Sequence, residues 1–299
     1  MNKIINADAL EAMRTLPDSC CRTCITSPPY YGLRDYGTAG QIGLEDTPDQ
    51  YIENLVKIFR EVRRVLKDDG TLWVNIGDSY TQKNLNGIPW LLAFALRSDG
   101  WYLRSDIIWQ KPNAMPESVK DRPTRAHEYI FLLSKSPRYY YDAEAVKEPA
   151  VGFYNAAPAG SAGTGKPNAR RRGNSRTFRG GGAYTHDRAQ NNSATVERES
   201  HGLAPNESGK RNLRSVWTIA TRPYKGAHFA TFPEELARPC VLAGSRPGDT
   251  VLDPFAGSGT TGAVAAQEGR DFIGIEINPD YCEIIRQRLD ACCQKGAKP

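Results

Sequence analysis

The sequence has no long apolar run, no recognisable leader and no regular cysteine spacing, and each absence excludes a class of protein. No segment approaches the about 18 consecutive apolar residues that span a membrane. The first eight residues lack the apolar core of a signal peptide. The seven cysteines are an odd number, and we interpret them as reduced thiols of a cytoplasmic protein. No further Cys or His follows Cys20, Cys21 and Cys24 at ligand spacing, so we expect no metal site.

Positive charge is concentrated in one part of the chain. Residues 151–225 hold 13 Lys and Arg against 4 Asp and Glu, a net charge of +9, whereas the whole chain carries +5. A basic segment on a mildly acidic body indicates that a polyanion binds at one place. The alternative is a solvated loop whose arginines have no partner, and composition alone does not separate the two.

Pattern and composition divide the chain into three parts. Residues 1–148 alternate apolar strands with amphipathic helices, and residues 214–299 form a second strand–helix unit. Residues 149–213 are rich in Gly, Asn, Arg and Ser without an apolar period, which is typical of a functional loop or a disordered segment. Strands are predicted at residues 3–5, 21–26, 71–76, 106–109, 129–133, 250–253 and 271–276.

Several helices begin at residues whose side chains accept hydrogen bonds from the first turn. The predicted caps are Asp8, Thr47, Thr231 and Asn278. Pro48 follows one of these caps at the first helical position, where a proline is well tolerated. The apolar stripe of that helix extends to Leu66, and residues 68–70 are predicted to end it.

A glycine-rich turn follows the strand at 250–253. Gly257, Gly259 and Gly262 match the pattern G-x-G-x-x-G, and Glu276 ends the next strand. Such a turn indicates a nucleoside ligand whose ribose hydroxyls donate hydrogen bonds to the carboxylate of Glu276. Asp253 precedes the turn, where it would repel a pyrophosphate but attract an ammonium group, so S-adenosylmethionine fits better than NAD. The alternative is a tight turn that binds nothing.

A second motif, Ser27-Pro28-Pro29-Tyr30, follows the strand at 21–26. The two prolines fix two φ angles and remove two N–H donors, and the first holds Ser27 in an extended conformation. The result is a stiff corner with free carbonyls, one hydroxyl and one ring at a strand tip, where open α/β sheets bind ligands. The corner suits a flat molecule that carries an amino group, although a rigid surface turn would have the same sequence.

Together the two motifs resemble those of S-adenosylmethionine-dependent DNA amino-methyltransferases, and their order is that of the β class. The resemblance implies a Rossmann-like α/β fold, with a mostly parallel twisted sheet, helices on both faces and an inserted DNA-recognition region at 149–213. The C-terminal part supplies only two strands of the nucleoside-binding half. We therefore predict that residues 3–8 supply the third, so that the fold is circularly permuted.

The motifs and the resemblance assign two groups of site residues. The catalytic group is Ser27, Pro28, Pro29 and Tyr30. The cofactor group is Asp8, Ala9, Phe232, Asp253, Pro254, Phe255, Gly257, Ser258, Gly259, Thr260, Glu276 and Ile277. Asp8 has two interpretations that can coexist, a contact with the adenine amino group and a helix cap.

The corner predicts a mechanism. The Ser27 hydroxyl and the Pro28 carbonyl would accept hydrogen bonds from the target amine and localise its lone pair, while Tyr30 stacks on the base. The base must leave the DNA helix to reach such a pocket. Positioning and electrostatics then supply the catalysis, with no metal and no covalent enzyme intermediate.

Ser27 also bears on the target base. Related adenine enzymes usually carry Asp or Asn at this position, whereas Ser resembles the cytosine-N4 branch, and residues 228–233 resemble a segment found in such proteins. We therefore favour cytosine N4, with adenine N6 as the alternative. Three rivals are a glutamine methyltransferase, which uses Asn-Pro-Pro-Tyr, an inactive DNA-binding homologue and an NAD-dependent oxidoreductase.

The expected substrate is double-stranded DNA, bound in part by arginines of the insert through phosphates or guanine edges. The candidates are Arg170, Arg171, Arg172, Arg176 and Arg179. The resemblance further implies a prokaryotic or phage protein with a cognate restriction endonuclease as a partner. It allows a monomer or a homodimer and predicts no membrane association.

Overall fold

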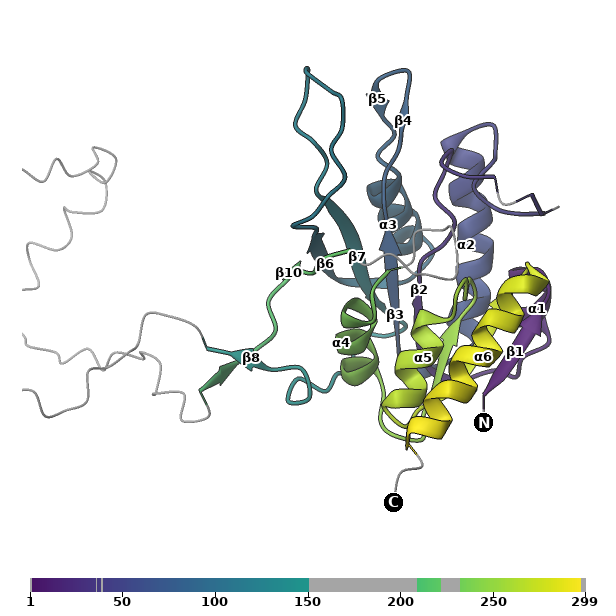
Figure 1. Cartoon of the computed structure of the whole chain (residues 1–299). Coiled ribbons are helices and arrows are strands. Elements are labelled where there is room, and N and C mark those ends of the chain that lie inside the picture. The colour runs from purple at the N-terminus through teal and green to yellow at the C-terminus, as the bar shows by residue number, and fades with distance from the viewer. Residues whose placement is uncertain (1, 36, 39, 151–208, 222–231, 297–299) are drawn as a thin grey trace, which may run out of the picture. The chain divides into compact units, whose positions relative to one another are not determined.

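The computed structural model describes residues 2–35, 37–38, 40–150, 209–221 and 232–296, with side chains described as far as residue 292 (Figure 1). The chain forms two compact units, Met1–Lys147 with Asn212–Pro299, and Glu148–Arg211. The described part of the second unit is a short antiparallel ladder of β8 (Glu148–Pro149) and β9 (Lys210–Arg211). Within the described ranges, no helix has the length and apolar character needed to cross a membrane.

An eight-stranded sheet forms the centre of the larger unit, in the order β1-β12-β11-β2-β3-β7-β6-β10. Neighbouring strands are parallel except at β3–β7 and β7–β6. The strands are β1 Lys3–Asn6, β2 Cys21–Thr26, β3 Leu66–Ile76, β6 Tyr102–Gln110, β7 His127–Ser134, β10 Val216–Thr218, β11 Thr250–Asp253 and β12 Asp271–Glu276. A separate hairpin pairs β4 (Tyr80–Thr81) with β5 (Asn84–Leu85).

The N-terminal strand lies against the last strand of the chain. β1 runs parallel to β12, with Ile5 opposite Ile275 and Asn6 opposite Glu276. The Asn6 amide donates to the carbonyls of Glu276 and Ile277, each at 2.9 Å. The prediction that the N-terminus supplies the third strand of this half of the sheet is therefore confirmed.

Helices cover both faces of the sheet (Figure 1). The buried side chains form two separate cores. One core lies under α1 Ala9–Arg14, α2 Pro48–Val65 and α3 Ile88–Ser98. The other lies under α4 Glu234–Gly244, α5 Thr260–Gln267 and α6 Pro279–Gly296. Phe59 and Phe272 are fully buried, one in each core. The predicted fold class, a mostly parallel α/β sheet with helices on both faces, is confirmed.

Three of the predicted caps accept the expected hydrogen bonds. The Asp8 carboxylate accepts from the N–H of Glu11, Thr47 Oγ1 from that of Gln50, and the Asn278 amide oxygen from that of Asp280. The fourth prediction was wrong: α4 begins at Glu234, Pro233 occupies the cap position and no side chain caps the helix. Thr231 itself lies outside the described residues.

The predicted end of α2 was also wrong. The helix ends at Val65, and Leu66 already has the extended backbone of β3. A β-bulge follows, because Cys21 faces Leu66 while Thr23 faces Thr71. Gly70 lies in the bulge, where a Cβ atom would meet the Arg22 carbonyl at 2.9 Å. This close approach of two backbones explains the glycine, which the sequence pattern had suggested as a helix stop.

Candidate active site

The predicted site residues gather where five parallel strands end. β1, β12, β11, β2 and β3 are neighbours and run in the same direction, so their carboxyl ends lie at one edge of the sheet. Asp8, Glu276, Asp253 and Ser27 each lie at or just beyond one of these ends. The structure thus brings together the two motifs that lie more than 200 residues apart in the sequence.

Asp253 makes the direct link between the two motifs. One carboxylate oxygen accepts from Thr26 Oγ1 at 2.6 Å and from the Phe255 N–H at 3.1 Å. The other accepts from Thr261 Oγ1 at 2.8 Å. Burial raises the pKa of the Asp253 carboxyl to about 7, although these hydrogen bonds favour its charged form. Hydrogen bonds from the protein thus engage both oxygens of this carboxylate.

The first two glycines of the turn shape its backbone. Gly257 and Gly259 have φ angles of +52° and +78°, in the region that favours glycine. The Gly257 N–H donates to Glu276 Oε2 at 2.8 Å, and the Asn278 N–H donates to Oε1 at 2.9 Å. Burial also raises the pKa of the Glu276 carboxyl. Each oxygen keeps a further lone pair, which fits the ribose hydroxyls of a nucleoside.

The third glycine serves packing. A Cβ atom on Gly262 would lie 2.6 Å from Cε1 of the buried Phe272 ring, and so would one on Gly274. The ring therefore fits between α5 and β12 only because both positions lack a side chain. This contact sets the distance between the helix and the sheet beneath the turn.

The structure places the remaining members of the predicted cofactor group as follows. Ala9, the first residue of α1, is buried, Ile277 is half-buried, and Phe232 packs at the margin of the core under α4, α5 and α6. Pro254, Ser258 and Thr260 are buried, and Phe255 is half-buried. Pattern reasoning missed Arg288 of α6, which donates to the Ser258 carbonyl at 2.8 Å and pairs with Glu234 at 3.1 Å.

The proline corner is fixed from two sides. Tyr51 of α2 donates its hydroxyl to the Pro29 carbonyl at 2.8 Å. A Cβ atom on Gly77 would come within 2.6 Å of the Tyr30 ring, so the ring packs directly against this glycine. Pro28 is buried, while Ser27 and Tyr30 are half-buried. The corner is therefore rigid, as its sequence predicts.

A polar network surrounds the Tyr30 hydroxyl. It donates to Glu128 Oε2 at 2.6 Å and receives a hydrogen bond from the Asn75 amide at 2.8 Å. The same amide nitrogen lies 3.0 Å from Glu128 Oε2 and 3.3 Å from Ser27 Oγ. Lys111 forms an ion pair with the other Glu128 oxygen. Burial, followed by the charge of Glu128, raises the pKa of Tyr30, so its phenol stays protonated.

Sequence reasoning did not assign Asn75 or Glu128 to the site. A polar residue near the tip of an otherwise apolar strand was a signal for Asn75. Glu128 gave no such signal, because only the antiparallel pairing of β3 with β7, in which Ile76 faces Tyr129, brings it to this edge. The five candidate arginines, Arg170, Arg171, Arg172, Arg176 and Arg179, lie outside the described residues.

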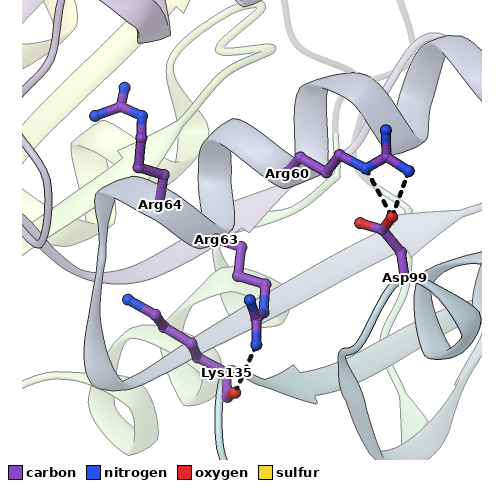
Figure 2. Close-up of a pocket in the computed structure, with 5 residues that line it drawn as sticks. All are labelled: Arg60, Arg63, Arg64, Asp99 and Lys135. Carbon is purple, nitrogen blue, oxygen red and sulfur yellow. Dashed lines mark hydrogen bonds and ion pairs between the residues drawn. The ribbon is translucent and has the colours of Figure 1, made fainter.

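A pocket of about 330 Å³ lies at the opposite edge of the sheet, where β3 begins and β7 ends (Figure 2). Arg60, Arg63, Arg64, Asp99 and Lys135 line it. Figure 2 shows the ion pair of Arg60 with Asp99 and the hydrogen bond that Arg63 donates to the Lys135 carbonyl. Arg64 pairs with Asp18 and Glu61, and Lys135 with Asp68. Acids thus pair with three of these cations, Arg60, Arg64 and Lys135, and the pocket is remote from the proline corner.

Comparisons with known proteins agree with this geometry. A family described as DNA methylase matches residues 21–287. The type II methyltransferase M.Cfr9I of Citrobacter freundii is 46% identical over 315 residues, covering 96% of this chain and 87% of the relative. M.SmaI of Serratia marcescens, another type II methyltransferase, is 46% identical over 316 residues, covering 96% of this chain and 90% of the relative.

Two solved structures share the fold. The PvuII DNA methyltransferase, described as cytosine-N4-specific, has a TM-score of 0.66 at 19% identity, with 98% of this chain and 91% of that chain covered. TTHA0409 of Thermus thermophilus, solved with S-adenosyl-L-methionine, has a TM-score of 0.60 at 24% identity, with 98% and 96% covered.

Proposed function

The chain belongs to the DNA methylase family, and from this membership we propose that it methylates the N4 amine of cytosine in double-stranded DNA. The observation that carries the choice of base is Ser27, a neutral hydroxyl at the corner where related adenine enzymes usually have Asp or Asn. Asp253 ties this corner to the glycine turn through Thr26, so one site can hold both the methyl donor and the base.

S-adenosylmethionine is the cofactor, and it supplies the methyl group as a sulfonium. The glycine turn and the Glu276 carboxylate fit its ribose, since Glu276 is held in place by two backbone N–H groups and keeps free lone pairs. Asp8, at the end of the adjoining strand β1, is suited to the adenine amino group while it caps α1.

The corner orients the target amine. Ser27 Oγ and the Pro28 carbonyl accept its two N–H groups, and Tyr30 stacks on the flipped base. The rigidity of the corner, held by Tyr51 and Gly77, supports this role because a reacting amine must be placed within a few tenths of an ångström.

Residues 149–213 form the DNA-recognition region in this proposal, since they hold most of the excess positive charge of the chain. The type II names of the relatives further support a cognate restriction endonuclease as a partner.

Nucleoside analysis tests the proposal. The purified chain is incubated with S-adenosylmethionine and mixed-sequence DNA from a host without methylation, and the DNA is digested for mass spectrometry. We expect N4-methylcytosine. N6-methyladenine instead would overturn the choice of base, and the absence of any methylated nucleoside at every salt concentration would overturn the enzymatic proposal.

A further inference from the structure

The hydrogen bonds around Tyr30 run in one direction. Ser27 Oγ donates to the Tyr30 hydroxyl at 3.4 Å, and that hydroxyl donates to Glu128 Oε2 at 2.6 Å. Stacking on a base requires only the ring of Tyr30. It does not explain why the Tyr30 hydroxyl is held by hydrogen bonds to Glu128 and Asn75. The chain of donors begins at the side chain proposed to touch the target amine and ends on a carboxylate.

We propose that Glu128 is the final acceptor of the proton that the target amine loses, and that Ser27 and Tyr30 pass this proton to it. The inference rests on the proposed function, because it concerns the same amine. It gives a role in proton transfer to Glu128, which lies outside both motifs, and to the Tyr30 hydroxyl, which stacking on the base does not use.

The step balances in atoms and charge. The amine nitrogen forms a bond to the methyl carbon while the carbon–sulfur bond of the sulfonium donor breaks, and its electron pair stays on sulfur. The nitrogen then carries one proton too many. That proton moves to Ser27 Oγ, the Ser27 hydroxyl proton to the Tyr30 oxygen, and the Tyr30 proton to Glu128 Oε2. Ser27 and Tyr30 end as neutral hydroxyls, and Glu128 ends as a neutral acid.

The surroundings of Glu128 suit an acceptor of protons. Lys111 forms an ion pair with its second oxygen and holds the carboxylate in place. Asn75 donates to both Tyr30 and Glu128, which holds the two oxygens in line. Asn75 is 4% exposed, and its own Oδ1 has no hydrogen-bond partner among the described residues. A buried acceptor without a hydrogen bond lowers the stability of the protein. Such a cost is typical of functional sites, where the position of the side chain matters more than its contribution to stability.

The relay can also recover. The side chain of Glu128 is 13% exposed, so the proton that it accepts can return to solvent between turnovers. The raised pKa of Tyr30 keeps its phenol protonated, and the tyrosine therefore transfers a proton without storing a negative charge.

Two conservative variants separate a relay from simple positioning. Glu128→Gln keeps an oxygen that accepts from Tyr30 but is a poor proton acceptor. Tyr30→Phe keeps the stacking ring and removes the hydroxyl. Single-turnover methylation at saturating S-adenosylmethionine and DNA should fall about 10²-fold in each variant, the range typical of lost acid–base catalysis. The double variant should be no slower than either single one, because the residues act in series.

Binding and pH provide independent readouts. The affinities for S-adenosylmethionine and DNA, measured by calorimetry and fluorescence anisotropy, should stay within about threefold of the parent, a change of under about 1 kcal/mol. The single-turnover rate of the parent should fall in acid, and Glu128→Gln should lose this dependence. Glu144→Gln, which alters an exposed carboxylate paired with Lys147, is the matched control.

Each outcome decides between the hypotheses. A parent that transfers no methyl group to DNA contradicts the proposed function itself. An active parent with Glu128→Gln or Tyr30→Phe at the parent rate overturns the relay alone, as do additive losses in the double variant. If Glu128→Gln fails to fold by circular dichroism, Tyr30→Phe decides the question by itself.

Discussion

At the scale of single residues, Asp253 has an unusual position. Asp253 is 1% exposed, and its carboxylate accepts hydrogen bonds from Thr26, just before the proline corner, and from Thr261 of the glycine turn. Burial raises its pKa from an ordinary value of 3.8 to about 7. The folded protein therefore binds a proton here over a pH range in which the unfolded chain has released it.

The sign of the resulting pH dependence follows from this shift. Below about pH 4 the carboxyl is protonated in both states, and its contribution to stability is fully present. That contribution is lost as the pH rises through about 7, by at most about 1.4 kcal/mol per pH unit. Asp253→Asn removes the titrating group and leaves room for Thr261 to donate to the Ile25 carbonyl instead, which lies 3.2 Å away.

We therefore expect the unfolding free energy of Asp253→Asn, relative to the parent, to increase between pH 4.5 and pH 7.5. Urea denaturation of both proteins without cofactor measures this difference. A difference that is constant with pH would show that Asp253 does not titrate with a raised pKa in the folded protein.

At the scale of elements, the contact of α5 with β12 depends on the absence of two side chains. The Phe272 ring occupies the space that Cβ atoms on Gly262 and Gly274 would need. In an ordinary helix interior, alanine is more stabilising than glycine by roughly 1 kcal/mol. At Gly262 the clash of an alanine Cβ with the Phe272 ring should cost more than this gain in helix stability.

Gly262→Ala should lower the free energy of unfolding by about 2 kcal/mol, the size of a typical overpacking cost. Phe272→Leu in the same chain should recover part of that loss, because the smaller side chain frees the space. Thermal and urea denaturation of the two single variants and the double variant measure the coupling. A stabilised Gly262→Ala would contradict the packing role.

Elements and caps could largely be predicted from local patterns, whereas contacts between distant strands could not. Thr47 and Asn278 cap helices as expected, since a cap needs only its own first turn. Gly70 was misinterpreted because its role depends on the Arg22 backbone. Glu128 was missed because its importance comes from Tyr30, 98 residues away in sequence. Tertiary pairing alone creates such a network.

At the scale of the whole molecule, charge is separated along the chain. Residues 151–225 carry +9 and the remainder carries −4. If the basic segment binds DNA phosphates, the logarithm of DNA affinity should fall steeply and linearly with the logarithm of salt concentration. Cofactor affinity involves no polyanion and should change little.

Replacing Arg170, Arg171 and Arg172 together by Gln should reduce the magnitude of this salt slope by about 2.7, because each phosphate that an arginine neutralises contributes about 0.9 to the slope. Fluorescence anisotropy with duplex DNA over a range of salt concentrations measures the slope. Arg60→Gln is the control, because Arg60 lies in the remote pocket on Asp99 (Figure 2). An unchanged slope in the triple variant would exclude these arginines from the DNA contact.

The pairing of β1 with β12 also constrains the order of events during synthesis. Asn6 contacts the carbonyl of Glu276, a residue 270 positions later, so β1 cannot pair until β12 has been synthesised. Contacts of such high sequence separation form late and slowly in folding. A nascent or prematurely terminated chain can therefore hold an intact proline corner while its nucleoside half is incomplete. Competence to methylate would thus be acquired only after residue 276 has left the ribosome.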